Sequence, residues 1–303
     1  MNDPVIALPH WLGAKKTQWD EIYLPLSISS LKKSQPADRE ILYIDANDNF
    51  AITAGGRSTS VSTSLLSSDD ISTFVDSYVH LSTNHHEFEL RSILRMFYLR
   101  NLFRHLNIKS AFTVESDVLV LQDLSIMLSG FGLVSPDAAL TGLKCPATAW
   151  FKQDYLEYYC DMVLTVYTGS VIKALTSWYP KYLERGGLGG ICDMTFHSYA
   201  IKQEHGFSNS FVLIDSSDPI PNFIPGHNDS LSFDNMLRTL TLGSHGIQSA
   251  IEPRSKMPIK SVHFDGDRRA FVFTEEGQRI WMGSLHLQGS TKSLMGRYYT
   301  DLF

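Results

Sequence analysis

Residues 110–121 read SAFTVESDVLVL, and this stretch decides the predicted fold. Apolar and β-branched residues fill both alternating sets of positions, as expected for a strand buried on both faces. Glu115 and Asp117 interrupt the run two positions apart, and the period of two in a strand points both side chains to one side. Burying two uncompensated carboxylates costs several kcal/mol. The stretch therefore predicts either a cation beside the two acids or a strand that ends there with solvated acids.

Two segments upstream predict the rest of an α/β core. Between Glu87 and Leu106, apolar residues recur every three to four positions, which predicts an amphipathic helix packed on a sheet. Residues 40–45, EILYID, predict an early buried strand of a parallel sheet, because the apolar run ends in acidic and turn-forming residues. The sequence thus predicts a central, mostly parallel sheet flanked by helices.

Three features further along the chain each have two interpretations. The aromatic residues between Trp150 and Tyr167 either fill the core or line a sugar site, because aromatic faces stack on sugar CH groups. Residues 186–190, GGLGG, are too rich in glycine for a helix or strand interior, and predict a flexible loop or a close backbone approach to a ligand. Asp193 begins a predicted helix over 194–202, either as its N-cap or as a residue of the site.

A histidine and a lysine lie close together in residues 286–292, HLQGSTK. Carboxylate oxygens suit Mg²⁺ or Mn²⁺, and an added imidazole tilts the choice toward Mn²⁺. The lysine supplies a point charge for phosphate groups. The chain has 11 histidines, so His286 is either a metal ligand or an ordinary imidazole with partners of its own.

Composition and charge narrow the class of protein. The 303 residues are enough for one elaborated α/β domain, and 43% hydrophobic with 19% charged residues is typical of a folded enzyme. The formal net charge of −6 offers no basic field for nucleic acid, which we therefore do not expect as a partner.

The cysteines and the apolar runs predict the compartment. Cys145, Cys160 and Cys192 are too widely spaced for a zinc site or a closed set of disulfides, which favours a reducing compartment. The first residues, MNDPVIALPHWLGAKK, lack the charged start and uninterrupted apolar run typical of a signal peptide, and no stretch approaches the roughly 18 consecutive apolar residues of a transmembrane helix. We expect a cytoplasmic protein with no transmembrane segment, and peripheral membrane contact stays open.

The order of these segments resembles the GT-A glycosyltransferases, in particular the retaining glycogenin and bacterial galactosyltransferase type. The helix ELRSILRMFYLRNLF and the following FTVESDVLVL are similar to the arginine-bearing helix and acid-x-acid strand of that family. TGSVIKAL and GGLGGICDMTF are similar to its donor-facing and acceptor-facing loops, and HLQGSTK matches its HxxGxxK pattern. Glu115 stands where the family more often has Asp, and Ser293-Leu294 stands where the retaining group has Pro-Trp, so the stereochemistry stays open.

The resemblance implies a fold and a set of site residues. The fold is a single Rossmann-like GT-A domain over residues 1–303, with a core at about 40–205 and a C-terminal extension, 206–303, that closes over the donor site. The implied metal ligands for Mn²⁺ or Mg²⁺ are Glu115, Asp117 and His286. The implied donor-binding residues are Arg95, Gly289 and Lys292. Asp193 stands where an acid contacts the transferred sugar or the acceptor, and it would be the base in an inverting enzyme.

The implied activity is metal-dependent transfer of a hexose from a nucleotide diphosphate sugar, UDP-linked, to a carbohydrate or other glycan acceptor. Two alternatives stay open. A sugar-nucleotide nucleotidyltransferase or pyrophosphorylase uses a similar sheet and metal, but usually carries a glycine-rich basic loop after its first strand, and none is seen near Asp45. A non-catalytic carbohydrate-binding module would keep the fold without turnover.

Overall fold

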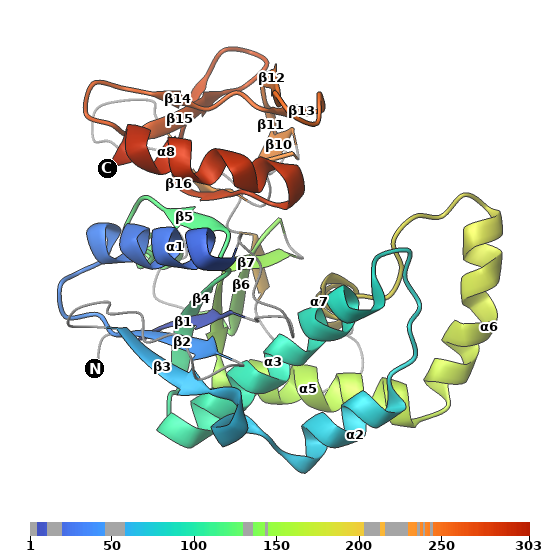
Figure 1. The fold of residues 1–303 in the computed structure, drawn as a ribbon. Coiled ribbons are helices and arrows are strands. Elements are labelled where there is room, and N and C mark those ends of the chain that lie inside the picture. Colours follow the sequence, from blue (N-terminus) through green and yellow to red (C-terminus); the bar gives the residue numbers. More distant parts are fainter. Residues whose placement is uncertain are drawn as a thin grey trace.

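The structure is a computed structural model of the 303-residue chain (Figure 1). The residues that it describes are 5–10, 20–45, 58–129, 136–142, 145–202, 213–215, 230–234, 237–238, 240–242 and 245–303. Much of the segment 206–229, at the start of the expected C-terminal extension, lies outside them.

A seven-stranded sheet forms the centre of the molecule, in the order β3-β2-β1-β4-β7-β6-β8. Its strands are β1 (Val5–Pro9), β2 (Ile41–Asp45), β3 (Ser58–Ser62), β4 (Ser110–Val114), β6 (Ala138–Thr141), β7 (Cys145–Lys152) and β8 (Leu213–Asp215). Only β7 runs against its two neighbours, and all other pairings are parallel. The expected α/β fold with a mostly parallel central sheet is confirmed.

The sheet reaches beyond the core boundaries expected from the sequence. β1 lies between β2 and β4, so the centre of the sheet begins at Val5 and not at about residue 40. At the other end, β8 pairs with β6 although it follows residue 205. A five-residue apolar run carries too little periodicity to be assigned from sequence, and its pairing with both neighbours decides its place.

Helices cover both faces of this sheet (Figure 1). The helices are α1 (Asp20–Ser34), α2 (Asp69–Ser77), α3 (His86–Leu106), α4 (Ile126–Ser129), α5 (Gln153–Thr168), α6 (Val171–Glu184), α7 (Asp193–Lys202) and α8 (Met295–Leu302), with the 3-10 turns η1 (Thr63–Leu66) and η2 (Gly289–Leu294). Alternate residues of β1 enter different cores: Ala7 packs with residues of α2, α3 and α5, whereas Ile6 and Leu8 pack with α1. The predicted helix from Glu87 to Leu106 is therefore confirmed as α3.

Residues 110–121 form two strands in two different sheets, so the prediction of one interrupted strand was wrong. β4 ends at Val114 in the central sheet, and β5 (Val118–Val120) pairs antiparallel with β16 (Arg279–His286) in a second sheet. The other strands of that sheet are β9 (Ser230–Phe233), β14 (His263–Phe264) and β15 (Ala270–Phe273). Because both strands are buried, their composition does not reveal the break; Glu115 and Asp117 lie in the turn that joins the two sheets.

The second sheet lies beside α1 and α8 at the top of Figure 1. Two short hairpins belong to the same C-terminal part of the chain: β10 (Thr241–Leu242) with β11 (His245–Gly246), and β12 (Ser249–Ile251) with β13 (Pro258–Lys260). Strand β5 thus ties the middle of the sequence to its C-terminal end.

The aromatic and glycine-rich segments serve the packing of the chain itself. Phe151, Tyr155, Tyr159 and Tyr167 are buried in the core against α3, so the core interpretation of these aromatics holds. In the glycine-rich loop, a Cβ on Gly190 would lie 2.0 Å from the carbonyl oxygen of Leu81. The close backbone approach predicted there is made to the chain's own segment and not to a ligand.

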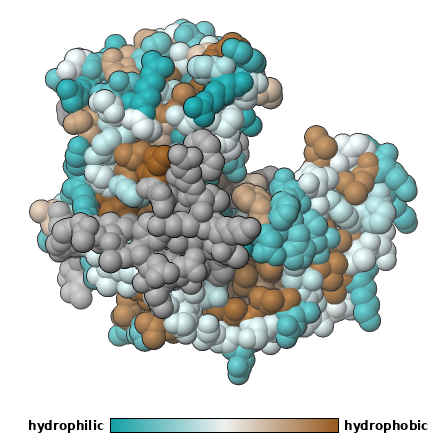
Figure 2. All heavy atoms as spheres, in the orientation of Figure 1, coloured by the Kyte–Doolittle hydropathy of each residue, from teal (hydrophilic) through white to brown (hydrophobic). Residues whose placement is uncertain are grey.

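Helix α6 projects from the body at the right of Figure 1. Figure 2 shows hydrophobic side chains among hydrophilic ones on this arm, where Val171, Trp178, Leu183 and Leu188 are exposed. Within the described residues, no helix combines the length and the apolar composition that crossing a bilayer requires.

Candidate active site

A cleft of about 990 Å³ opens at the edge of the central sheet where β1 and β4 end and β7 begins. The first turns of α3, the start of α7 and the residues after β16 complete its walls. Ligands of open α/β sheets bind outside the carboxyl ends of the strands, which is this edge. All the residues predicted for the site line the cleft: Arg95, Glu115, Asp117, Asp193, His286, Gly289 and Lys292.

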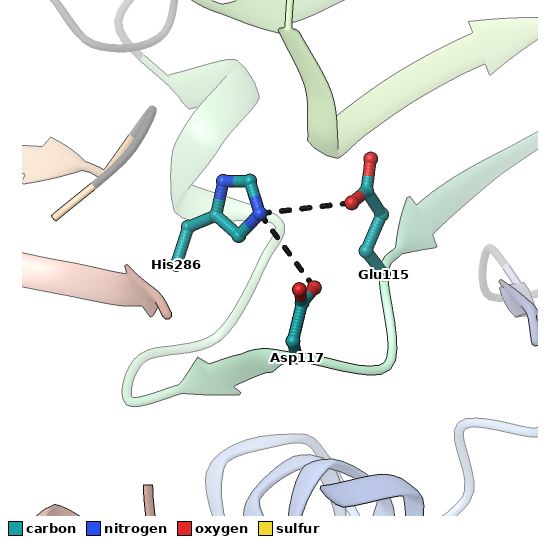
Figure 3. Close-up of side chains that lie close together, drawn as sticks. All are labelled: Glu115, Asp117 and His286. Atoms are coloured by element: carbon teal, nitrogen blue, oxygen red, sulfur yellow. Dashed lines mark ion pairs between the residues drawn. The ribbon is translucent and has the colours of Figure 1, made fainter. Parts of the chain in front are cut away.

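Two carboxylates and an imidazole meet in this cleft (Figure 3). The Nε2 atom of His286 lies 3.6 Å from Oε2 of Glu115 and 3.6 Å from Oδ1 of Asp117. The antiparallel register pairs Val118 with His286, and Leu287 donates its backbone N–H to the carbonyl oxygen of Asp117 (2.9 Å). The pairing of β5 with β16, and not alternation along one strand, therefore brings these residues together.

This set of atoms fits a divalent cation by its chemistry. One atom from each of Glu115, Asp117 and His286 lies within 4.8 Å of the others. Bonds of about 2.1–2.4 Å to one ion can span such separations, and two oxygen ligands with one nitrogen suit Mn²⁺ or Mg²⁺. These three side chains are the group that can hold a metal among the residues that the structure describes.

Positive charge lies next to the carboxylates. Lys292 places Nζ 3.0 Å from Oδ2 of Asp117. Burial alone would raise the pKa of Asp117, but His286 and Lys292 outweigh it and lower that pKa. Burial would lower the pKa of His286, but the neighbouring Asp117 raises it well above its ordinary value.

Arg238 is a residue of the cleft that sequence reasoning missed. It donates a hydrogen bond to Oγ of Ser290, and it lies beside Gly289, which begins η2 with a φ of +62°. The sequence around Arg238 is rich in turn-forming residues and shows no periodicity, so it carried no signal for this position. Arg238 and Lys292 thus bring two positive charges to the part of the cleft that holds Glu115 and Asp117.

Arg95 connects the two acidic parts of the site. Its Nη1 atom lies 2.5 Å from Oε1 of Glu115, and its Nη2 atom forms an ion pair with Asp193. The exposed fractions of the three side chains are 16%, 19% and 6%, so both ion pairs are largely screened from solvent. Burial would lower the pKa of Arg95, but the two carboxylates outweigh it and raise that pKa.

The N-cap position of α7 belongs to Cys192, whose carbonyl oxygen accepts the backbone N–H of Phe196 (3.3 Å), so the N-cap interpretation of Asp193 was wrong. Asp193 is the first residue of the helix. Its Oδ1 atom accepts the backbone N–H of Met194 (2.8 Å) at the start of α7, while its side chain lines the cleft. Burial raises the pKa of Asp193, Glu115 adds to this effect, and Arg95 opposes it. A carboxylate with a raised pKa is a stronger base than one in water.

A buried ion pair between Lys260 and Asp234 contacts the backbone of His286. Lys260 and Asp234 have no exposed surface, and their Nζ and Oδ1 atoms lie 2.6 Å apart. Oδ2 of Asp234 accepts the backbone N–H of His286 (3.2 Å), and Sγ of Cys145 lies 4.0 Å from Nδ1 of the imidazole. These contacts hold the ring with Nε2 toward the carboxylates. No local pattern of residues connects Asp234, Lys260 or Cys145 with His286.

His197 is a buried histidine of α7, the helix that Asp193 begins. From its environment we predict a pH dependence of the free energy of unfolding. Nδ1 of His197 lies 2.7 Å from the hydroxyl oxygen of Tyr155, and burial lowers the pKa of the imidazole to about 3. Between about pH 6.5 and pH 3 the unfolded chain binds a proton there that the folded chain does not. Each pH unit below 6.5 therefore costs up to about 1.4 kcal/mol of the free energy of unfolding.

We expect His197→Phe to reduce the loss of free energy of unfolding below pH 6.5. Urea unfolding of both proteins between pH 4 and 8 measures it: the difference in free energy of unfolding should change in favour of the variant as the pH falls below 6.5, and stay constant above it. Parallel curves over the whole range would show that His197 is not held neutral.

No protein-family model and no curated protein matches the sequence. Among solved structures, the chain is similar to the apo form of mouse xyloside xylosyltransferase 1, with a TM-score of 0.47 and 9% identity over 71% of this chain and 86% of that one. For the galactosyltransferase LgtC in complex with donor and acceptor sugar analogs, the TM-score is 0.34 and the identity 12%, over 63% of this chain and 68% of that one. For a cytidylyltransferase from Leptospira borgpetersenii serovar Hardjo-bovis, the TM-score is 0.33 and the identity 13%, over 52% of this chain and 63% of that one.

Proposed function

We propose that this chain is a GT-A glycosyltransferase that moves a hexose from a UDP-sugar to a carbohydrate acceptor with the help of Mn²⁺ or Mg²⁺. The observation that carries the proposal is the meeting of Glu115, Asp117 and His286 beside Lys292 in a cleft at the carboxyl edge of the sheet. A site with paired carboxylates, an imidazole and adjacent cations suits a metal-bound diphosphate better than it suits an uncharged ligand.

In this proposal, Glu115, Asp117 and His286 would hold the ion, which would supply positive charge to the diphosphate leaving group. The Nζ atom of Lys292 and the guanidinium of Arg238 add positive charge at the same end. The imidazole of His286 must be neutral to act as a ligand, so a proton and a divalent cation compete for its Nε2 atom.

We propose that Asp193 acts at the sugar end of the donor, and its position in the lining of the same cleft supports this role. With its raised pKa it accepts a hydrogen bond from a sugar hydroxyl, or takes the proton of the acceptor if the reaction inverts. Arg95 fixes the distance between Asp193 and Glu115, and so aligns the sugar end of the site with the metal end.

The C-terminal extension, residues 206–303, is proposed to close over the donor. This proposal is supported by the part of the cleft expected to bind the diphosphate. The extension supplies four residues of its lining: Arg238, His286, Gly289 and Lys292. A cytoplasmic location remains part of the proposal, and so does the UDP-linked nature of the donor.

Metal-dependent release of UDP tests the proposed function. With a panel of UDP-, GDP- and CMP-sugars, we expect slow hydrolysis of a UDP-hexose that EDTA abolishes and Mn²⁺ restores, because the diphosphate leaves poorly without a cation. Exchange that depends on pyrophosphate would instead identify a nucleotidyltransferase. Glycan binding without turnover of any donor would identify a binding module.

A further inference from the structure

Helix α6 and the loop after it form an arm that leaves the body of the molecule (Figure 1). One face of the helix anchors the arm, because Ile172, Leu175 and Tyr179 pack against the core that also contains α3 and α5. Within the described part of the chain, no residue of α6 lines the candidate active site. The arm is therefore an ordered element that the proposed reaction does not use.

The face of α6 that points away from the core carries apolar and cationic side chains together. Residues at the spacings i, i+7, i+10 and i+14 lie on one side of a helix, and on this helix they are Val171, Trp178, Lys181 and Arg185. All four are exposed, Trp178 to 43%. The indole of Trp178 stacks on the ring of Tyr182 with the ring centroids 4.8 Å apart, which holds it at the surface.

The loop after α6 adds a further apolar side chain to the arm. The hydroxyl of Tyr182 donates a hydrogen bond to the carbonyl oxygen of Leu188 (2.5 Å), so the loop is tied to the helix. The side chain of Leu188 is nevertheless 82% exposed, the largest fraction among the large hydrophobic side chains that the structure describes. Such a side chain gains free energy when it leaves water for an apolar phase.

The arm is basic although the chain as a whole is acidic. Residues 171–188 contain three cations, Lys173, Lys181 and Arg185, against one carboxylate, Glu184, whereas the formal net charge of the chain is −6. The three cations are exposed, and none of them forms an ion pair with a carboxylate of the described residues. Their charge is therefore available to an anionic partner.

A tryptophan beside lysine and arginine on an exposed helix face suits the surface of an anionic membrane. Indole rings lie at the level of the lipid headgroups, and lysine and arginine attract anionic headgroups. A second copy of the chain fits less well, because contact between two arms would bring two net positive charges together. A neutral glycan would leave the cations without a partner.

We propose that the arm formed by α6 and the loop 186–190 binds the surface of an anionic phospholipid membrane. Lys181 and Arg185 contact the headgroups, and Trp178 and Leu188 enter the boundary between headgroups and acyl chains. Because only a few side chains take part, the contact is reversible. The inference goes beyond the proposed function and does not depend on it.

Co-sedimentation of the full-length chain with lipid vesicles tests this surface. We expect the wild type to bind vesicles of phosphatidylcholine with about 30 mol % phosphatidylglycerol at least about 10-fold more tightly than vesicles of phosphatidylcholine alone. The double variant Lys181→Gln/Arg185→Gln should bind the anionic vesicles about 10- to 30-fold more weakly, because each cation near such a surface contributes about fivefold. Added NaCl should weaken wild-type binding, since it screens these charges.

Two further variants separate the arm from charge in general. Lys109→Gln/Arg297→Gln removes two exposed cations outside the arm and should bind anionic vesicles like the wild type within about twofold. Trp178→Ala keeps the charge of the arm and should bind about 5- to 20-fold more weakly, because apolar area is lost. A thermal melt of each variant checks that the fold is retained.

The inference is overturned if the wild type binds anionic and neutral vesicles equally or binds neither. It is also overturned if Lys181→Gln/Arg185→Gln binds like the wild type. A dimer in sedimentation velocity that Trp178→Ala abolishes, without vesicle binding, would instead identify a second copy as the partner. UDP release measured without vesicles should stay within about twofold of the wild type in Lys181→Gln/Arg185→Gln. A chain that binds anionic vesicles but hydrolyses no sugar nucleotide contradicts only the proposed function.

Discussion

Asp117→Asn lowers the rate of metal-dependent UDP release by at least about 1000-fold, which corresponds to the several kcal/mol that a bound cation contributes to the transition state. The expected reason is the loss of one of the two oxygen ligands, since Oδ1 of Asp117 lies 3.6 Å from the ligand nitrogen of His286. The neutral amide also loses the ion pair with Lys292, so the affinity for Mn²⁺ falls with the rate.

The measurement compares rates over a titration of Mn²⁺, with a thermal melt of each protein. Asp301→Asn is the matched control, because Asp301 is an aspartate of α8 that pairs with Arg297 and is 41% exposed. It should keep the wild-type rate. If Asp117→Ala or Asp117→Asn turns over like the wild type with an intact fold, the assignment of the metal ligands is wrong.

Arg95→Met destabilises the folded protein by about 3–5 kcal/mol, because it leaves the carboxylates of Glu115 and Asp193 in a site with little solvent and no guanidinium between them. We expect Arg95→Lys to recover only part of this loss. An ammonium group is a single point charge, whereas the planar guanidinium pairs with both carboxylates at once. Turnover should fall about 10- to 100-fold in Arg95→Met, as it does when the support of a metal ligand is removed.

Urea unfolding of a double-mutant cycle tests this prediction. Adding Asp193→Asn to Arg95→Met removes one of the unpaired charges, so the double variant should be more stable than Arg95→Met alone. An Arg95→Met protein that unfolds at the same urea concentration as the wild type would show that the two ion pairs contribute nothing to the fold.

The parts of the structure that could be predicted are those whose signal is local. Helix α3 begins and ends within one residue of the predicted Glu87 and Leu106, because its apolar residues repeat with the helical period over five turns. Asp193 was correctly placed at the start of a helix, and β2 was correctly predicted as an early strand of a parallel sheet.

The stretch around Glu115 shows where local signals end. Its apolar composition predicted burial correctly on both sides of the acids, but burial is the same in β4 and β5 although they belong to different sheets. Apolar composition indicates that a strand is buried, but it does not indicate which strand will pair with it. For the same reason β1 was missed, since a run of five residues has a place in the sheet only through its two partners.

The sequence by itself determined which chemical groups this protein can use: two carboxylates in an apolar run, a histidine and lysine near the C-terminus, an arginine on a long amphipathic helix, and no basic field for nucleic acid. Only the tertiary structure decided how they meet. The register of β5 against β16 sets His286 beside Asp117, and Arg95 joins Glu115 to Asp193. These contacts join residues far apart in the chain, and they depend on strand pairing and packing that no local pattern of residues specifies.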